Sequence, residues 1–421
     1  MARLRVLLRR MRRPSLLLLI ALLLGSTTLN YVDRQVLSVL APVLRDEFGL
    51  SNEQYAWIVN SFMAAYALSM PLAGWVLDRI GVGRGLTMAV LWWSAAGMLT
   101  AAVSGPVSLA SARAVFAVGQ SGAWPAFAKA ASVWVPQSWR PMAIGVCNSG
   151  SSLGSMIAPP LVVWLAADFG WRGAFLITGA LGLLWVAAFA SFRRRTPEMS
   201  GSGGPAGPPA AAVSWRALLP RRQTWIVFVC RFLADPIWYF YVFWIPEFLT
   251  RERGLSLAAV GAVAWIPFLV SAVANFATGM IANRLASLGW AVRKTRRFLM
   301  LVGAAGSPVG VAAVHAESVA MTMTFICVAI FFWMIWSVTV QTLPGDYFPP
   351  QAVASVYGVG GLGSTLGSVI SIWLVGRTLD STQSYEPVFV GLGLLMPVAF
   401  AAGMCLMGRL KPVELEELNP Q

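Results

Sequence analysis

Five ionisable residues interrupt the long apolar stretches of this 421-residue chain: Asp33, Arg34, Arg113, Arg231 and Asp235. An ionised side chain in apolar surroundings is costly unless it is paired, so each of these residues requires a partner or a ligand. Arg231 and Asp235 are four residues apart and share one face of a helix, where they can pair. The three arginines exceed the two acids by one charge. Because a guanidinium can donate two parallel hydrogen bonds to a carboxylate, this excess indicates recognition of an organic anion.

The alternative interpretation of these five residues is that they pair with one another and only fix helix packing. The Arg231–Asp235 spacing suits that alternative best. Arg34 and Arg113 suit it less well, because the acids are too few to neutralise every arginine. Tyr31 is one turn before Arg34 on the same helix face, so it can either donate a hydrogen bond to a ligand hydroxyl or serve as a packing residue.

The elements that position these residues are membrane-spanning helices. The chain is 57% hydrophobic and 11% charged, whereas a soluble domain carries about 25% charged residues. A span needs about 20 apolar residues and must be helical, because lipid offers backbone amides no partner. The sequence therefore predicts an all-α polytopic membrane protein with twelve transmembrane helices. The predicted spans are 16–40, 54–76, 84–104, 107–127, 140–166, 172–192, 224–249, 257–282, 298–315, 319–342, 352–377 and 386–408.

The distribution of the basic residues along the chain indicates membrane topology and not binding to a polyanionic partner. Of 31 Lys+Arg residues, six lie within Met1–Arg13, six between Arg193 and Arg222 and five between Arg284 and Arg297. Under the positive-inside rule, both termini and the central loop are expected in the cytoplasm. Nucleic-acid binding is excluded, because the charges do not form one folded face with base-stacking aromatics. The four cysteines show no metal-ligand spacing, so no metal and no cofactor are expected.

A composition change divides the chain in two. Ser200–Pro209 reads SGSGGPAGPP, which cannot pack a core and predicts a flexible linker. We expect a six-helix half over 1–192, a cytoplasmic linker over 193–222 and a second six-helix half over 223–421. A repeated loop motif supports this division, since a glycine, a polar residue and an arginine recur after the second and eighth spans. Its residues are Gly74, Asp78, Arg79, Gly81 and Arg84 in the first copy and Gly279, Asn283 and Arg284 in the second.

These motifs resemble a known family. The stretch Gly74–Arg84 is similar to the cytoplasmic loop signature of the major facilitator superfamily, and Leu29–Arg34 resembles the first helix of its anion:cation symporter branch. Asn148–Trp164 and Arg231–Trp238 are similar to bacterial hexuronate (glucuronate and galacturonate) transporters, which usually carry Glu where this chain has Asp235. The resemblance covers nearly the whole chain. It implies a secondary active transporter in a bacterial-type inner (plasma) membrane, with the substrate near the bilayer midplane.

The resemblance also implies roles for individual residues. Gln120 departs from the pattern, because proton-coupled relatives usually carry Glu there, and Gln120 cannot change charge. It lies seven residues after Arg113, on the same helix face, so we expect Arg113 to be its neighbour. The coupling ion is expected to be H+, with Na+ or a potential-driven uniport as alternatives. Expected substrate contacts are Arg34, Arg113, Tyr31, Ser151, Asn148, Trp238 and Gln341. Expected coupling residues are Asp33, Gln120, Asp235 and Arg231.

The leading hypothesis is therefore alternating-access transport of a carboxylated sugar or similar organic anion by a monomer embedded in the lipid bilayer. One alternative is an exporter of drugs or metabolites, which buried arginines disfavour because cationic drugs require acids. Another is a membrane-embedded anion sensor, for which we expect a soluble output domain that the sequence lacks. An enzyme is disfavoured, because neither a nucleophile–base pair nor a metal motif is present.

Overall fold

The computed structural model describes residues 13–50, 52–195, 213–255, 259, 263, 265–407 and 411–414. These residues fold into helices that group into two compact units. Unit 1 comprises Met1–Pro136, Val146–Val213 and Phe348–Gly358, and unit 2 comprises Gln137–Gly145, Ser214–Tyr347 and Val359–Gln421. The linker predicted over 193–222 lies mostly outside the described residues.

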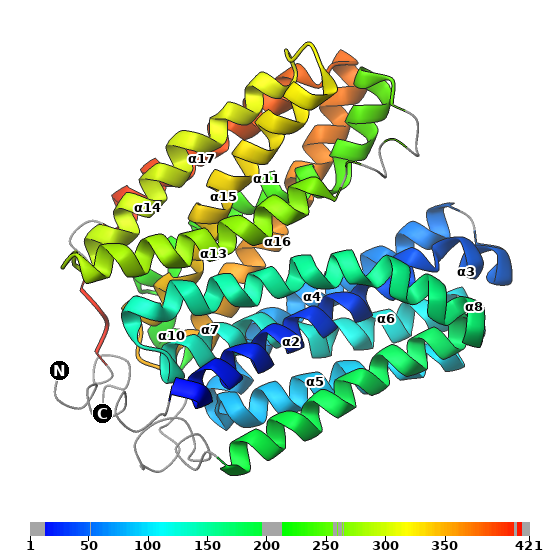
Figure 1. Cartoon of the computed structure of the whole chain (residues 1–421), viewed down its shortest axis with the longest axis horizontal. Coiled ribbons are helices and arrows are strands. Elements are labelled where there is room, and N and C mark those ends of the chain that lie inside the picture. The colour runs from blue at the N-terminus through cyan, green and yellow to red at the C-terminus, as the bar shows by residue number, and fades with distance from the viewer. Residues whose placement is uncertain are drawn as a thin grey trace. The chain divides into compact units, whose positions relative to one another are not determined.

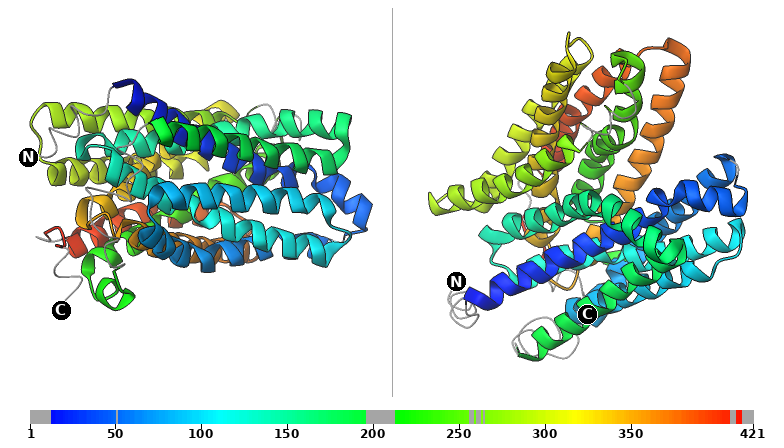
Figure 2. Two further views of the ribbon diagram at one scale, coloured as in Figure 1. Left: turned by 90° about the horizontal axis from the view of Figure 1, so that it is seen from below. Right: turned by 45° about the vertical axis from the view of Figure 1, so that its right-hand side comes forward.

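Unit 1 contains the helices that follow the N-terminus (Figure 1). They are α2 (Arg13–Val39), α3 (Ala41–Phe48), α4 (Asn52–Ile80), α5 (Val82–Leu99), η1 (Thr100–Ala102), α6 (Pro106–Ser121), α7 (Ala123–Trp134) and α8 (Arg140–Arg195), whose first residues belong to unit 2. Gly170, with φ of 70°, breaks the 56-residue α8, so this helix covers two predicted spans, 140–166 and 172–192. The first part of α8 runs beside α2 (Figure 2).

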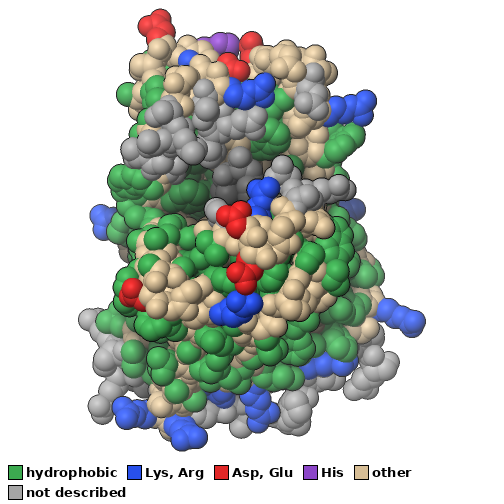
Figure 3. All heavy atoms as spheres, turned by 90° about the vertical axis from the view of Figure 1, so that its right-hand side faces the viewer, with side chains coloured by type: hydrophobic (Ala, Val, Ile, Leu, Met, Phe, Trp, Pro, Cys, Tyr) green, Lys and Arg blue, Asp and Glu red, His purple; other side chains and the backbone are tan. Residues whose placement is uncertain are grey.

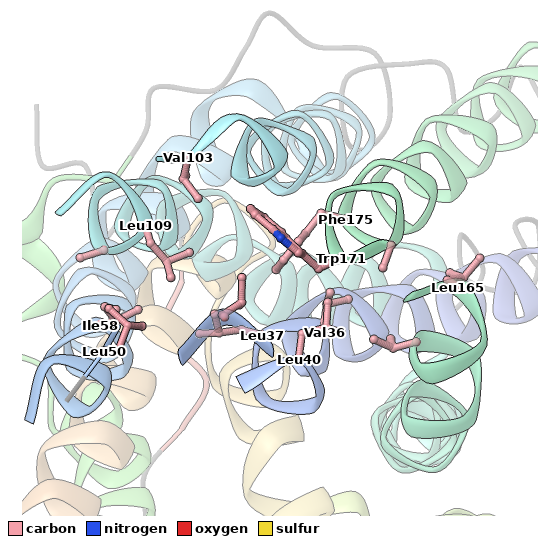
Figure 4. Close-up of a cluster of buried hydrophobic side chains, with 14 residues drawn as sticks. Val36, Leu37, Leu40, Leu50, Ile58, Val103, Leu109, Leu165, Trp171 and Phe175 are labelled. Atoms are coloured by element: carbon pink, nitrogen blue, oxygen red, sulfur yellow. The ribbon is translucent and has the colours of Figure 1, made fainter. Parts of the chain in front are cut away.

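A hydrophobic cluster anchors the end of α2 just beyond Arg34. Val36 and Leu37 of α2, and Leu40 directly after it, pack there with Leu109 of α6, and all four side chains are at most 4% exposed (Figure 4). Trp171 joins them from α8, directly after the Gly170 break. Burial of this apolar surface holds the three helices together, and so fixes the positions of the polar residues one or two turns away.

Unit 2 contains most of the remaining helices. They are η2 (Gln137–Trp139), α10 (Trp215–Leu218), α11 (Arg222–Arg253), α13 (Ile266–Ser287), α14 (Val292–Gly306), η3 (Ser307–Ala313), α15 (Val319–Tyr347), α16 (Val353–Thr382) and α17 (Glu386–Met407). The first turns of α16, up to Gly358, belong to unit 1.

Seven helices in the described part of the chain are long and apolar enough to cross a membrane. Because one of them is the broken α8, they account for eight of the twelve predicted spans. The other four predicted ranges, 54–76, 107–127, 224–249 and 298–315, also lie mainly in helices. Large apolar side chains are exposed, such as Leu68 at 71% and Val107 at 68%, and hydrophobic side chains cover much of the face in Figure 3. The count of twelve and the orientation of the termini stay predictions.

Candidate anion-binding site

Arg34 of α2 is held by a glutamine from α6. The Arg34 Nε donates a hydrogen bond to Gln120 Oε1 at 3.0 Å, and Gln120 Nε2 donates to the Asn30 carbonyl at 2.8 Å. The Gln120 side chain is fully buried. A neutral amide therefore orients the Arg34 guanidinium without neutralising its charge. The sequence predicted Arg113 as the neighbour of Gln120, whereas both hydrogen bonds of the amide run to α2.

Three aromatic rings surround the Arg34 guanidinium. Its Cζ lies 5.0 Å from the ring centroid of Tyr31, 5.1 Å from that of Phe62 and 5.0 Å from that of Tyr66. Phe62 and Tyr66 stack on each other, with centroids 5.7 Å apart. Ring faces attract a cation without supplying a counter-charge, so the cage stabilises Arg34 in its charged form. The sequence analysis identified Tyr31 and missed the two α4 aromatics.

Arg113 of α6 is a second cation near Phe62, and unlike Arg34 it is buried. It is 2% exposed, and its Cζ lies 4.3 Å from the Phe116 ring centroid and 5.6 Å from the Phe62 centroid. Its Nε and Nη1 have no hydrogen-bond partner within the described part of the chain. Phe62 thus contacts both guanidinium groups, which are close enough to repel each other. The unpartnered donors of Arg113 can bind a carboxylate, and the anion would also relieve the repulsion between the two guanidinium groups.

Asp33 of α2 is buried close to Arg113. Its side chain is 4% exposed, and Thr178 of α8, Trp93 of α5 and Arg113 are its closest polar neighbours. Neither carboxyl oxygen makes a hydrogen bond of good geometry to any described residue. A buried acid with unfilled hydrogen-bonding capacity beside an arginine can exchange a proton when the charge on that arginine is engaged elsewhere.

The polar start of the Asn148–Gly154 stretch is close to the same part of α2. Gly154 lets α8 approach, because a Cβ there would lie 2.8 Å from the Tyr31 Cβ. Asn148 is buried, and the Ser151 Oγ donates to the Asn148 carbonyl at 2.6 Å within the helix. Ser151 and Asn148 therefore lie in the part of α8 that packs beside α2 in unit 1.

Unit 2 holds the other predicted residues. Arg231 Nε donates to Asp235 Oδ2 at 3.0 Å, so the pairing predicted from their spacing is present. Trp238 stacks on Trp333, with ring centroids 5.3 Å apart and an interplanar angle of 12°. The Trp333 indole donates to the Ala234 carbonyl at 2.7 Å, which fixes the stack. Sequence reasoning missed Trp333, which lies in a uniformly apolar stretch.

Gln341 of α15 lies in the same unit. It is 8% exposed, and its Nε2 donates to the Ser337 Oγ at 3.0 Å, one turn earlier on the helix.

The first copy of the loop motif forms a buried ionic contact. Asp78 accepts hydrogen bonds from Lys129 Nζ at 2.8 Å and from the backbone amides of Ala354 at 3.2 Å and Ser355 at 2.7 Å. These amides begin α16, where the helix dipole also favours an anion. Burial raises the pKa of the Asp78 carboxyl and lowers the pKa of the Lys129 ammonium, and their contact opposes both shifts. Gly74 leaves room for this approach, because a Cβ there would collide with the Ala354 backbone.

Arg79, Gly81 and Arg84 complete the first copy at the end of α4. Both arginine side chains are exposed, and the Arg79 guanidinium lies 3.4 Å from the Trp75 ring centroid. Gly81 has a φ of 84° between α4 and α5, a conformation that other residues adopt only with strain. The glycine therefore makes the tight connection between these two helices.

The second copy keeps the glycine contact without the acid. A Cβ on Gly279 of α13 would lie 2.5 Å from the Met142 Cα, at the start of α8. Asn283 replaces the acid, and its Oδ1 is buried without a hydrogen-bond partner among the described residues. Arg284 is exposed. The two copies therefore share close packing against a helix start and differ in charge.

Replacing Asp78 with Asn is expected to destabilise the protein by about 3 kcal/mol, because Lys129 would stay buried without a carboxylate. Thermal unfolding of the purified protein in detergent measures this loss as a lower midpoint. The matched control is Arg84→Gln, which removes an exposed charge from the same motif and should leave the midpoint within about 1 °C of wild type. Equal midpoints for Asp78→Asn and wild type would contradict the expected contribution of the pair.

Comparison with known proteins assigns this arrangement to a family. The profile of the Major Facilitator Superfamily matches residues 23–372. A hexuronate transporter of Escherichia coli K12 is 31% identical over 392 residues, covering 89% of this chain and 90% of that protein. A galacturonate transporter of Dickeya chrysanthemi is 34% identical over 265 residues, covering 60% of this chain and 76% of that protein. The solved structure of a proton:xylose symporter has a TM-score of 0.73 at 15% identity, covering 95% of this chain and 97% of that one.

The chain therefore belongs to the Major Facilitator Superfamily. It is a multi-pass membrane transporter and not an enzyme. The resemblance to bacterial hexuronate transporters inferred from its motifs is confirmed by these relatives.

Proposed function

We propose that this protein transports a carboxylated sugar, with a hexuronate as the leading candidate, by alternating access coupled to H+. The observation that carries the proposal is the pair of arginines formed by the partly buried Arg34 and the buried Arg113, whose guanidinium groups lie 5.1 and 5.6 Å from the Phe62 ring centroid. Relatives named for hexuronate, galacturonate and D-galactonate, all sugar acids, support the substrate class.

Each arginine has a distinct part in the proposed binding step. Gln120 fixes the Nε of Arg34 and so restricts the orientation of its guanidinium group. Arg113 offers the donors Nε and Nη1. A carboxylate that accepts from both groups would compensate two like charges at once. The Tyr31 ring lies beside Arg34, and its hydroxyl, together with Asn148 and Ser151 of the adjacent α8, could recognise sugar hydroxyls.

Unit 2 supplies groups suited to a sugar ring. Trp238 is held in its stack by Trp333 and offers a flat aromatic face, while Gln341 and its partner Ser337 offer hydrogen-bonding groups. In this proposal the substrate site opens alternately to the two sides of the membrane as the halves 1–192 and 223–421 change conformation. The segment 193–222 joins the halves, and both termini are cytoplasmic.

Asp33 is the proposed coupling residue. When a substrate carboxylate engages Arg113, the Asp33 carboxylate loses part of its electrostatic partner and its protonated form becomes more favourable. The Arg231–Asp235 pair in unit 2 is a second candidate, because it is also buried and ionisable.

The proposal is tested by uptake into proteoliposomes that contain the purified protein. Radiolabelled glucuronate, galacturonate, galactonate and the neutral sugar galactose are supplied with an imposed pH gradient, an imposed Na+ gradient or neither. We expect accumulation of at least one sugar acid with the pH gradient and none of galactose. Accumulation of galactose, or of no sugar acid under any gradient, would contradict the proposed substrate class. Accumulation of a sugar acid only with the Na+ gradient would show that Na+, and not H+, is the coupling ion.

A further inference from the structure

A pocket lined by both charged and apolar side chains lies in unit 2, where α14 begins and α15 ends. Its volume is about 250 Å³. Apolar side chains form part of the wall, and the polar lining residues are Gln137, Arg293, Arg296, Asp346, Tyr347 and Lys411. The proposed substrate arginines belong to unit 1, so this pocket is a separate feature of the protein.

The lining has three basic residues and one acid, and that acid is already engaged. Asp346 Oδ2 accepts from Arg296 Nε at 2.8 Å, and Asp346 Oδ1 accepts from Gln137 Nε2 at 3.2 Å. Arg140 Nη1 lies 3.6 Å from the same Oδ1. One carboxylate is thus shared between two guanidinium groups, and the lining as a whole carries three basic side chains against one acid.

Hydrogen bonds to the C-terminal segment hold the wall of the pocket in place. The backbone amide of Val413 donates to the Tyr347 carbonyl at 2.8 Å, and Gln223 Nε2 donates to the Lys411 carbonyl at 3.1 Å. Lys411 is therefore fixed beside the end of α15. Arg296 is 4% exposed and is held by Asp346, whereas Arg293 is exposed.

We propose that this pocket binds a phosphate group. Guanidinium groups donate paired hydrogen bonds to phosphate oxygens, a lysine adds a point charge, and the N-terminus of α14 adds the positive end of a helix dipole. Two sources share this chemistry, an anionic lipid headgroup and free phosphate. The lipid source suits the location, because α15 and α17 are long and apolar enough to span a membrane and end beside the pocket. Basic pockets at such helix ends bind anionic headgroups.

The test measures binding to the purified full-length protein in a mild detergent. Three probes are used: phosphatidylglycerol, phosphatidylcholine, and inorganic phosphate against chloride at equal ionic strength. Native mass spectrometry counts the bound lipid, and the unfolding midpoint reports binding of each probe. We expect phosphatidylglycerol to bind and to raise the midpoint, and phosphatidylcholine to do neither.

Variants assign the binding to the pocket. Arg293→Gln and Lys411→Gln remove exposed charges, and each is expected to weaken phosphatidylglycerol binding about tenfold through loss of one charge-assisted contact. The matched control is Lys294→Gln. Its ammonium lies in the same turn of α14 but is 4.2 Å from the Trp290 ring, outside the pocket lining, so this variant should bind as wild type does.

The outcomes separate the two phosphate sources and can refute the site. If the protein binds phosphatidylglycerol but not inorganic phosphate, the ligand of the pocket is a lipid headgroup. Binding of both, weakened alike by the two pocket variants, identifies a site for soluble phosphate as well. The proposal is overturned if wild type binds neither probe, if Arg293→Gln and Lys411→Gln bind as wild type does, or if Lys294→Gln weakens binding equally. None of these readouts depends on sugar-acid uptake.

Discussion

Arg34→Lys and Arg113→Lys are each expected to weaken binding of the transported sugar acid by about 1.5–3 kcal/mol, or roughly 10- to 100-fold. Lysine keeps the positive charge, so the expected loss comes from geometry. An ammonium cannot donate two parallel hydrogen bonds to one carboxylate.

At Arg34 the replacement removes a second interaction. The Nε hydrogen bond to Gln120 orients the guanidinium, and the rings of Tyr31, Phe62 and Tyr66 surround its flat group at about 5 Å. A flexible lysine would not be held in this cage in one orientation. We therefore expect Arg34→Lys to lose at least as much affinity as Arg113→Lys, whose guanidinium contacts only two rings among those described.

Calorimetry with the sugar acid identified by uptake measures the change in affinity. The matched control is Arg172→Lys, which keeps an exposed charge beside Glu47 in the same unit and should bind as wild type does, because surface pairs contribute little. Wild-type affinity in both Arg34→Lys and Arg113→Lys would show that these arginines only support packing. An equal loss in Arg172→Lys would show that the effect is not specific to the buried pair.

The sequence predicted those parts of the site that depend on one helix at a time. Runs of apolar residues predicted the spans, and the spacing of Arg231 and Asp235 predicted their ion pair. Arg34, Arg113 and Asp33 were noticeable because charge is costly in an apolar stretch. In each case the signal is local, since a charge or an i,i+4 spacing has the same meaning whichever helix packs nearby.

Contacts between helices could not be predicted in this way. Gln120 is 86 residues from Arg34 and shares a helix with Arg113, so spacing favoured the wrong partner. Phe62, Tyr66 and Trp333 gave no signal, because an aromatic residue in an apolar span can face lipid, another helix or a ligand equally well. Only the packing of α4 against α6, and of α11 against α15, distinguishes these possibilities.

Gln120→Glu is expected to make uptake depend more strongly on the pH gradient, and the hydrogen bonds of Gln120 explain why. A protonated carboxyl can reproduce both bonds, because it accepts from Arg34 Nε and donates to the Asn30 carbonyl. An ionised carboxyl keeps the first bond as an ion pair but turns an acceptor toward the Asn30 carbonyl. The charge on the introduced side chain therefore decides whether Arg34 is neutralised before substrate arrives.

The same reasoning sets the direction of the effect. At high external pH the introduced carboxylate competes with the substrate for Arg34, and we expect uptake about tenfold below wild type. At low external pH the carboxyl is protonated, Arg34 is available, and uptake should approach the wild-type rate. Wild type, with a neutral amide at this position, should show a weaker dependence that originates at Asp33.

The variant Asp33→Asn tests whether the pH dependence of wild-type uptake originates at Asp33. An asparagine cannot exchange a proton, so we expect it to abolish accumulation against a gradient while substrate exchange across the membrane persists. The measurement is initial uptake in proteoliposomes with the internal pH fixed and the external pH varied, for wild type, Gln120→Glu and Asp33→Asn, together with counterflow of preloaded substrate. Counterflow shows that a variant is folded and able to change conformation.

If Asp33→Asn accumulates substrate as wild type does, Asp33 does not couple transport to protons. If Gln120→Glu keeps the wild-type pH dependence, the contact between position 120 and Arg34 does not control substrate binding.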